Sequence, residues 1–478
     1  APQQSITITT PFHIKLPGNF SGLGHAGQAY QLTQWYPKPA VYDRKGWHPM
    51  PYLAQGELYS EFGSFDVRIT LPGNYVVAAT GQLQNAEEYE WLKTRGNFTW
   101  QPTSERKKVK KGMYKIVRND FPPSADSLKT LRYTTEHIHD FAWFADKRYV
   151  VTMDTCLLAS GKAVNTFAYF LPKQKESWAD IHAHLKQALQ FYSGALGEYA
   201  HPVASVVQGN RAMYSGTIIA VPATSTAQSL KDIVMHETGY NWLSGTINNN
   251  GREHAWMANG IASFLNEKHA GLLKDDKAAP RQYIRSQRFK NILLQSVVSV
   301  KKDQPVDLPA EDYTAFNYKL STCTKAALWM QLLEDHLTQP VFDSALRYYY
   351  SNWKFKHPYP ADFRKTVDSI SGKENDSVFA LLSAKGSLTS TFRKPIRFTW
   401  IGKPDETGKY DYIGIAPALG YNYYDKLMIG GIVHNYNLPF KPFQFVAAPL
   451  FATGSKRLNG SGRMSYTLYP GNIFHNIE

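Results

Sequence analysis

The residues of this chain that could do chemistry begin with His236 and Glu237, which are neighbours in the sequence. When a second histidine follows the first by four residues, both imidazoles fall on one helix face and can hold a zinc ion. The glutamate then acts as general base on a water molecule bound to that metal. Here the second histidine position is Tyr240. The pattern therefore predicts a hydrolytic zinc helix that has lost one of its ligands.

A second segment, with the sequence WMANG, covers residues 256–260. Together the two segments resemble the aminopeptidase N family of gluzincin metallopeptidases, in the type found in envelopes of Bacteroidetes. In that family a His-Glu-x-x-His motif is followed, after eighteen residues, by a ligand Glu within Trp-x-x-Glu-Gly. The same count from Tyr240 reaches Asn259. The resemblance thus implies that the third zinc ligand position is altered as well.

The resemblance also implies three positions that would handle substrate. A family Gly-x-Met-Glu motif, whose Glu holds the substrate amine, matches the stretch around Met213 but has Tyr214 in place of the Glu. A Tyr-x-Lys motif, whose Tyr stabilises the oxyanion, matches residues 323–325 but has Cys323 in place of the Tyr. A family Gln that approaches the amine matches Gln34, which could instead only fix its loop.

The donor set at the three ligand positions does not suit catalytic zinc. His236 offers an imidazole, but Tyr240 binds metal well only as a phenolate, and the usual pKa of tyrosine is about 10. Asn259 offers a neutral carbonyl where zinc favours an anionic or nitrogen ligand. We therefore expect no metal cofactor, vestigial roles for His236 and Glu237, and a small apolar role for Cys323.

An active zinc metallopeptidase with an unorthodox site is the alternative, and zinc would then be its cofactor. His254 and His269 could rescue a metal site only if both pointed into it. A third possibility is a purely structural subunit of an envelope complex.

Composition fits a cell-envelope protein. Aromatic residues make up 14% of the 478 residues and charged residues only 19%, and two cysteines imply no disulfide framework. The net charge of +14 includes the run RKKVKK at residues 106–111. Such a run suits anionic lipid head groups or polysaccharide, or is simply a solvated hairpin loop. No nucleic-acid motif accompanies it, so no nucleic-acid partner is expected.

Periodicity predicts a multidomain α+β chain. Residues 61–72 alternate as a half-buried strand, and the apolar residues from Trp178 to Tyr192 recur at helical spacing. We expect a truncated N-terminal β domain, the remnant of a β-sandwich, over 1–122. A thermolysin-like domain over 123–275 and a helical domain over 276–392 should follow.

Residues 393–478 are expected to form antiparallel strands, because aromatic, strand-length segments alternate there with turns rich in Gly, Asn and Pro. This is typical of an outer-membrane β-barrel, which would begin near Tyr412. Three or four strands cannot close a barrel, so either more strands follow or these form a soluble β-domain. The predicted function is an inactive peptidase-like module that binds a peptide or an envelope protein at the outer membrane.

Overall fold

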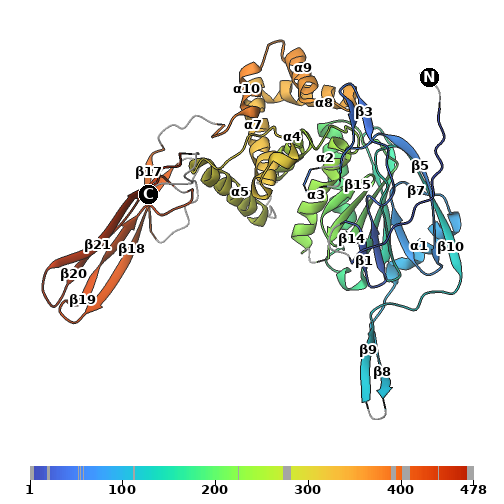
Figure 1. The fold of residues 1–478 in the computed structure, drawn as a ribbon, viewed down its shortest axis with the longest axis horizontal. Coiled ribbons are helices and arrows are strands. Elements are labelled where there is room, and N and C mark those ends of the chain that lie inside the picture. The colour runs from blue at the N-terminus through green and yellow to red at the C-terminus, as the bar shows by residue number, and fades with distance from the viewer. Residues whose placement is uncertain are drawn as a thin grey trace. The chain divides into compact units, whose positions relative to one another are not determined.

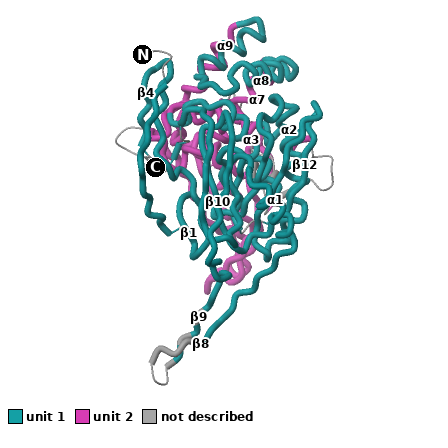
Figure 2. Tube along the Cα trace, turned by 90° about the vertical axis from the view of Figure 1, so that its right-hand side faces the viewer, with its two compact units in different colours: residues 1–252, 265–269, 337–373 teal, residues 253–264, 270–336, 374–478 magenta. Residues whose placement is uncertain are grey.

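The computed structural model falls into two compact units, which Figure 2 distinguishes by colour. Unit 1 contains residues 1–252, 265–269 and 337–373, and unit 2 contains the rest. The division into four domains stays a prediction. The residues described are 5–18, 22–51, 53, 55–56, 59–110, 113–223, 226–272, 281–388, 394–400, 410–439 and 441–470.

The N-terminal part of unit 1 is rich in β-structure, as the sequence predicts, and Figure 1 shows its strands in blue and cyan. Two sheets and two separate hairpins, β3–β4 and β8–β9, make up this region. The predicted strand at 61–72 is confirmed as β5 (Gly63–Pro72). The first sheet has the order β1 (Gly24–Ala26), β2 (Ala29–Leu32), β11 (Trp143–Asp146), β6 (Val76–Ala79), and the second has β5, β10 (Leu128–Ile138), β7 (Gln82–Leu83). The hairpins join β3 (Val41–Asp43) to β4 (Gly46–His48) and β8 (Thr103–Lys110) to β9 (Met113–Asn119).

Strand β6 is buried on both faces and therefore joins two cores. Its odd-numbered residues Val77 and Ala79 pack with Leu131 and Tyr133 of the second sheet. Its even-numbered residues face a five-stranded sheet instead, since successive side chains of a strand point to opposite sides. That sheet has the order β12 (Val150–Leu157), β13 (Ala163–Phe170), β14 (Val203–Gly209), β16 (Ile218–Pro222), β15 (Met213–Ser215).

Helices α2 (Ile181–Ala195) and α3 (Ala227–Leu243) pack against each other and contact the five-stranded sheet. The predicted apolar stripe is confirmed, because Ile181, Leu185, Leu189 and Tyr192 of α2 are all buried. Strand β15 lies at the edge of the sheet and contacts α3. The unit also contains α1 (Ala86–Lys93), η1 (Thr94–Asn97), η2 (Pro172–Gln174), α8 (Gln339–Trp353) and α9 (Pro360–Ser371).

Unit 2 is mainly helical as far as Ser383, and the sequence predicts helices here. Trp329 is fully buried there, with its ring 5.3 Å from that of Trp256 and 5.2 Å from that of Phe379. Within the described part of the chain, no helix is both long and apolar enough to cross a bilayer. The elements are α4 (Trp256–Leu272, shared with unit 1), α5 (Arg281–Ser299), η3 (Ala310–Asp312), α6 (Ala315–Lys319), the π-helical η4 (Leu320–Lys325), α7 (Ala326–Leu337), α10 (Asp376–Ala380) and η5 (Leu381–Ser383).

The C-terminal residues form one five-stranded sheet in the order β17 to β21. Strands β18 to β21 pair antiparallel, as predicted. The prediction was wrong for β17, which runs parallel to β18. The alternation of residues shows which segments are strands but does not encode their direction, which depends on the connection between them. The strands are β17 (Ile396–Trp400), β18 (Asp411–Asn422), β19 (Lys426–His434), β20 (Phe443–Ala452) and β21 (Leu458–Tyr466).

Candidate functional site

Helix α3 carries His236, Glu237 and Tyr240, and its start is fixed by a side-chain cap. The hydroxyl of Thr226 accepts a hydrogen bond from the backbone N–H of Ser229 at 3.2 Å. Such a cap satisfies one of the amide groups that have no partner in the first helical turn. His236 and Tyr240 are one turn apart, with ring centres 5.3 Å apart and planes at 89°. The helix thus brings both sequence-predicted positions together on one face.

Tyr240 is buried against a second tyrosine at a predicted site position. Its ring lies 5.7 Å from that of Tyr214 on β15, and the two planes are 15° from parallel. Only 8% of Tyr240 is exposed. Aromatic rings attract one another in such offset stacks, at centre distances of about 4.5–7 Å. Two positions that the resemblance assigns to a zinc ligand and an amine anchor are therefore joined as an aromatic pair.

The hydroxyl of Tyr214 forms a hydrogen bond with His139. A hydrogen bond of 2.6 Å joins the Tyr214 oxygen to Nε2 of His139. Burial lowers the pKa of His139 to about 4, so its imidazole is neutral at pH 7. Nδ1 of the same ring is buried and has no hydrogen-bond partner among the described residues. The Tyr214 ring is thus fixed at its hydroxyl as well as by stacking.

Gln34 lies in a buried polar network around Asp140. Its Nε2 donates to the Asp140 carboxylate at 2.7 Å, and its Oε1 accepts from the Lys38 ammonium at 2.9 Å. Lys38 also donates to Asp140 at 2.6 Å, and the Ser215 hydroxyl donates to it at 2.8 Å. Burial alone would raise the pKa of Asp140, but the Lys38 charge and these hydrogen bonds hold it below its usual value.

Both ends of the Gln34 amide are therefore occupied within the protein. Gln34 also has a backbone φ of 54°, in the left-handed region that few residues other than glycine adopt. This arrangement supports the interpretation that Gln34 fixes its loop. Sequence reasoning did not single out His139 or Asp140, because no local spacing marks a residue whose partners lie on distant strands.

Asn259 and Cys323 lie in unit 2, on α4 and on the π-helical turn η4. The Asn259 amide donates to the Thr322 hydroxyl at 3.3 Å, and that hydroxyl donates to the Tyr318 carbonyl at 2.8 Å. A glutamate carboxylate at position 259 could only accept a hydrogen bond from Thr322. The Thr322 hydroxyl would then have to donate to the carboxylate instead of to the Tyr318 carbonyl. The local network therefore suits the neutral amide.

The thiol of Cys323 is half-buried, and burial raises its pKa above the usual value. It is therefore protonated at neutral pH, whereas the nucleophile of a cysteine enzyme is the thiolate. Cys323 also lacks the phenolic hydroxyl that the resemblance assigns to this position. Cys323 lies within a π-helical turn. Such turns are rare in proteins as a whole, but many of those that occur are at functional sites.

The remaining histidines near these motifs have other neighbours. Nδ1 of His254 is 2.8 Å from the Asp307 carboxylate. The His269 ring packs with its centre 4.8 Å from that of Phe191. In the part of the chain that the structure describes, no group of three or more His, Cys, Asp or Glu residues is arranged to hold a metal ion. The residues present do not fit a catalytic zinc ion.

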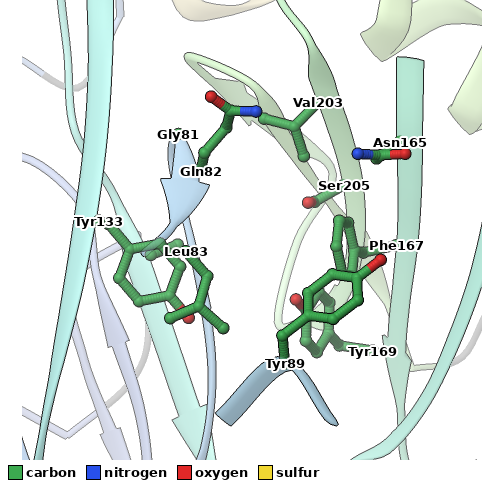
Figure 3. Close-up of a pocket in the computed structure, with 11 residues that line it drawn as sticks. Gly81, Gln82, Leu83, Tyr89, Tyr133, Asn165, Phe167, Tyr169, Val203 and Ser205 are labelled. Carbon is green, nitrogen blue, oxygen red and sulfur yellow. The ribbon is translucent and has the colours of Figure 1, made fainter. Parts of the chain in front are cut away.

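A small cavity of about 60 Å³ lies elsewhere in unit 1, and Figure 3 shows its lining. Aromatic rings line it, including Tyr133 of β10 and Phe167 and Tyr169 of β13. None of the predicted site residues lines it.

Comparisons with known proteins point to one peptidase family. The family model described as "Peptidase family M1 domain" matches residues 209–382, which include Tyr214, Tyr240, Asn259 and Cys323. The glutamyl aminopeptidase of Rattus norvegicus is 23% identical over 241 residues, which are 45% of this chain and 24% of that protein. The glutamyl aminopeptidase of Sus scrofa is 26% identical over 159 residues, or 31% and 16% of the two chains. The aligned parts thus span a quarter or less of these relatives.

Two solved structures share the fold. The M1 zinc metallopeptidase of Deinococcus radiodurans aligns with a TM-score of 0.52 at 15% identity, over 72% of this chain and 67% of that one. Aminopeptidase A of Legionella pneumophila, solved with aspartic acid, aligns with a TM-score of 0.53 at 13% identity, over 95% of this chain and 45% of that one. These findings support an M1 peptidase-like fold of the aminopeptidase N type.

Proposed function

We propose that this chain is a catalytically inactive peptidase-like module that binds a peptide or a protein partner. The observation that carries the proposal is the stacked pair of Tyr214 and Tyr240 at two positions that a peptidase would use for chemistry. Without a zinc ion no water is acidified, and Glu237 has no metal-bound water to deprotonate. A fold can persist with its binding surfaces after its catalytic groups are lost, since fold alone does not determine function.

The first test measures zinc and peptidase activity in the same preparation. We expect well under one equivalent of zinc by elemental mass spectrometry and no rise in unfolding temperature when zinc is added, because a ligand of the native state must stabilise it. Anilides of several amino acids should not be hydrolysed, including the glutamyl anilide suggested by the names of the relatives. A stoichiometric ion bound through His236, or steady turnover, would favour the active metallopeptidase instead.

Binding to a library of peptides then separates a binding module from a purely structural subunit. The proposal expects saturable binding of some peptides, which a purely structural subunit would not show. Binding should weaken when the loop of Gln34 is altered by Lys38→Ala, because Lys38 holds the Gln34 amide. Exposed Lys365 in α9 provides the matched control, Lys365→Ala.

We further propose that residues 393–478 hold the module at an outer membrane. The strand register supports this, since it aligns Leu419, Ile429, Phe451 and Leu458 in one row across β18 to β21. All four side chains are exposed, as are those of Ile396, Phe398 and Trp400 on β17. Large exposed apolar patches usually mark contact with a protein or a membrane. The closed barrel and the envelope location remain predictions.

The test of this placement is fractionation of the intact chain beside a version that ends near residue 392. We expect the intact chain to require detergent and the shorter version to remain in the aqueous fraction. Equal solubility of the two would assign the C-terminal strands to a soluble β-domain.

A further inference from the structure

The hairpin of β8 and β9 concentrates positive charge. Residues 103–119 contain seven Lys or Arg residues and one Glu, so this short segment supplies six of the fourteen excess positive charges of the chain. An exposed ion pair between Arg118 and Asp120 lies at its base. The seven basic residues are Arg106, Lys107, Lys108, Lys110, Lys111, Lys115 and Arg118.

The hairpin is not part of either of the larger sheets in this region of unit 1. Among the described strands, β8 and β9 pair only with each other, and Figure 1 shows the hairpin extending away from the rest of unit 1. A hairpin of two strands is marginally stable by itself in water. An anionic surface would be attracted to the net positive charge of this segment and would add contacts to the strand pair.

One face of the hairpin combines a cation with exposed apolar groups. Arg106 is opposite Ile116, and Tyr114 lies two residues from Ile116 on β9, so these three side chains share a face. Ile116 is 72% exposed and Tyr114 is 52% exposed. The Arg106 guanidinium lies 4.4 Å from the centre of the Tyr114 ring. This face therefore offers charge, an amphipathic ring and an aliphatic group together.

We propose that this face of the β8–β9 hairpin binds the surface of an anionic lipid bilayer. Lys and Arg are attracted to anionic head groups, while tyrosine rings favour the boundary between head groups and acyl chains. Ile116 can enter the same boundary, where its burial adds to the electrostatic attraction. A soluble polyanion would engage the cations but leave Ile116 and Tyr114 in water. This inference does not depend on the loss of peptidase activity or on the C-terminal sheet.

The experiment measures sedimentation of the intact chain with two kinds of vesicle. One contains phosphatidylglycerol and phosphatidylcholine in equal parts, and the other contains phosphatidylcholine alone. We expect a component of binding that requires phosphatidylglycerol and that falls as salt is raised. Binding through the apolar C-terminal sheet would instead be similar for both vesicles and insensitive to salt, so the two proposals can fail separately.

Two hairpin variants locate the salt-sensitive component. Arg106→Gln with Lys108→Gln should weaken it about 30-fold, since each basic residue near an anionic surface contributes about 1 kcal/mol, which is about a fivefold change in affinity. The matched control, Lys15→Gln with Lys173→Gln, removes two exposed lysines elsewhere in unit 1 and should change it little. Equal weakening by both variants would show a general effect of net charge and overturn the proposal.

The second variant, Tyr114→Ser with Ile116→Ser, distinguishes a bilayer from a soluble polyanion. We expect weaker binding to the phosphatidylglycerol vesicles but unchanged binding to dextran sulfate. If this variant binds the vesicles as well as the native chain does, the hairpin is a site for polyanions such as acidic polysaccharides and not for lipid. Because all four substituted hairpin residues lie on a strand pair outside the cores of unit 1, an unchanged thermal unfolding transition confirms that the body remains folded.

Discussion

Two neighbouring residues of β15 belong to regions of opposite chemistry. Tyr214 stacks on Tyr240 of α3, while Ser215, on the other side of the strand, donates to the buried carboxylate of Asp140. The first region contains positions that the resemblance assigns to catalysis, now occupied by aromatic rings. The second is a polar network that also holds Gln34. The candidate site thus has an aromatic pair on one side of β15 and a buried polar network on the other.

This difference shows how each region is stabilised. The tyrosine pair is held by burial and ring stacking, which tolerate a change of ring substituent. The Asp140 carboxylate accepts hydrogen bonds from Gln34, Tyr36, Lys38 and Ser215, so its removal leaves several buried donors without an acceptor. A buried polar network is favourable only when all of its members are satisfied. We therefore expect the polar region to be the less tolerant of substitution.

The largest expected effect comes from reversing the aromatic region. Tyr240→His with Asn259→Glu should restore tight binding of about one equivalent of zinc, because it completes a set of three ligands. Turnover should stay poor until Tyr214→Glu and Cys323→Tyr are added. Tyr240→His alone is the control and should not bind zinc tightly. Tight zinc binding by the native chain would contradict the proposal that the Tyr214–Tyr240 region does not hold a catalytic metal ion.

The second prediction concerns the polar region. Asp140→Ala should lower the free energy of unfolding by about 3–5 kcal/mol, because it leaves the Lys38 ammonium in a largely buried position without its partner. Urea denaturation measures the change. Asp66→Ala removes an exposed carboxylate paired with Arg132 and should have a far smaller effect. Similar losses in the two variants would show that the Asp140 network contributes no more than a surface ion pair.

The third prediction tests the aromatic pair by truncation. Tyr240→Ala should cost about 2–4 kcal/mol, since it removes a buried ring and leaves a cavity beside Tyr214. Tyr240→Phe keeps the stacked ring and should cost much less. Denaturation of both variants decides whether packing stabilises this region. An equal cost would place the stabilisation in the hydroxyl of Tyr240 instead.

The smallest effect, counted per pH unit, is a pH dependence at the junction of the two regions. The pKa of His139 is about 4 in the folded chain and about 6.5 without burial, so folding favours the neutral imidazole. Above pH 6.5 this ring is neutral in both the folded and the unfolded state, so its protonation does not change the free energy of unfolding. As pH falls from 6.5 to 4, only the unfolded chain takes up a proton, and stability falls by about 1.4 kcal/mol per pH unit.

His139→Asn should reduce this slope, which urea denaturation at several pH values would reveal. His201 has a pKa lowered to about 4 by its own burial and contributes a second, separate share. An unchanged slope in the His139→Asn variant would mean that the buried environment of His139 is not maintained in solution.

The sequence by itself determined much of the architecture. Helical periodicity located α2 and alternation located β5, while the count from Tyr240 to Asn259, taken with the resemblance, predicts two altered ligand positions. These features are local or have fixed spacing, so they can be followed along the chain. The direction of β17 could not be predicted in this way, because alternation is the same in either direction.

Only the tertiary structure decided what surrounds the motif positions. The stacking of Tyr214 on Tyr240 and the central place of Asp140 depend on residues that are far apart in sequence and meet only when the strands and helices pack. Neither His139 nor Asp140 has a local pattern that marks it as a partner of the site. Sequence spacing identifies the residues at the expected positions, whereas the packing of distant elements determines what surrounds each one and hence its pKa and its capacity to bind a ligand.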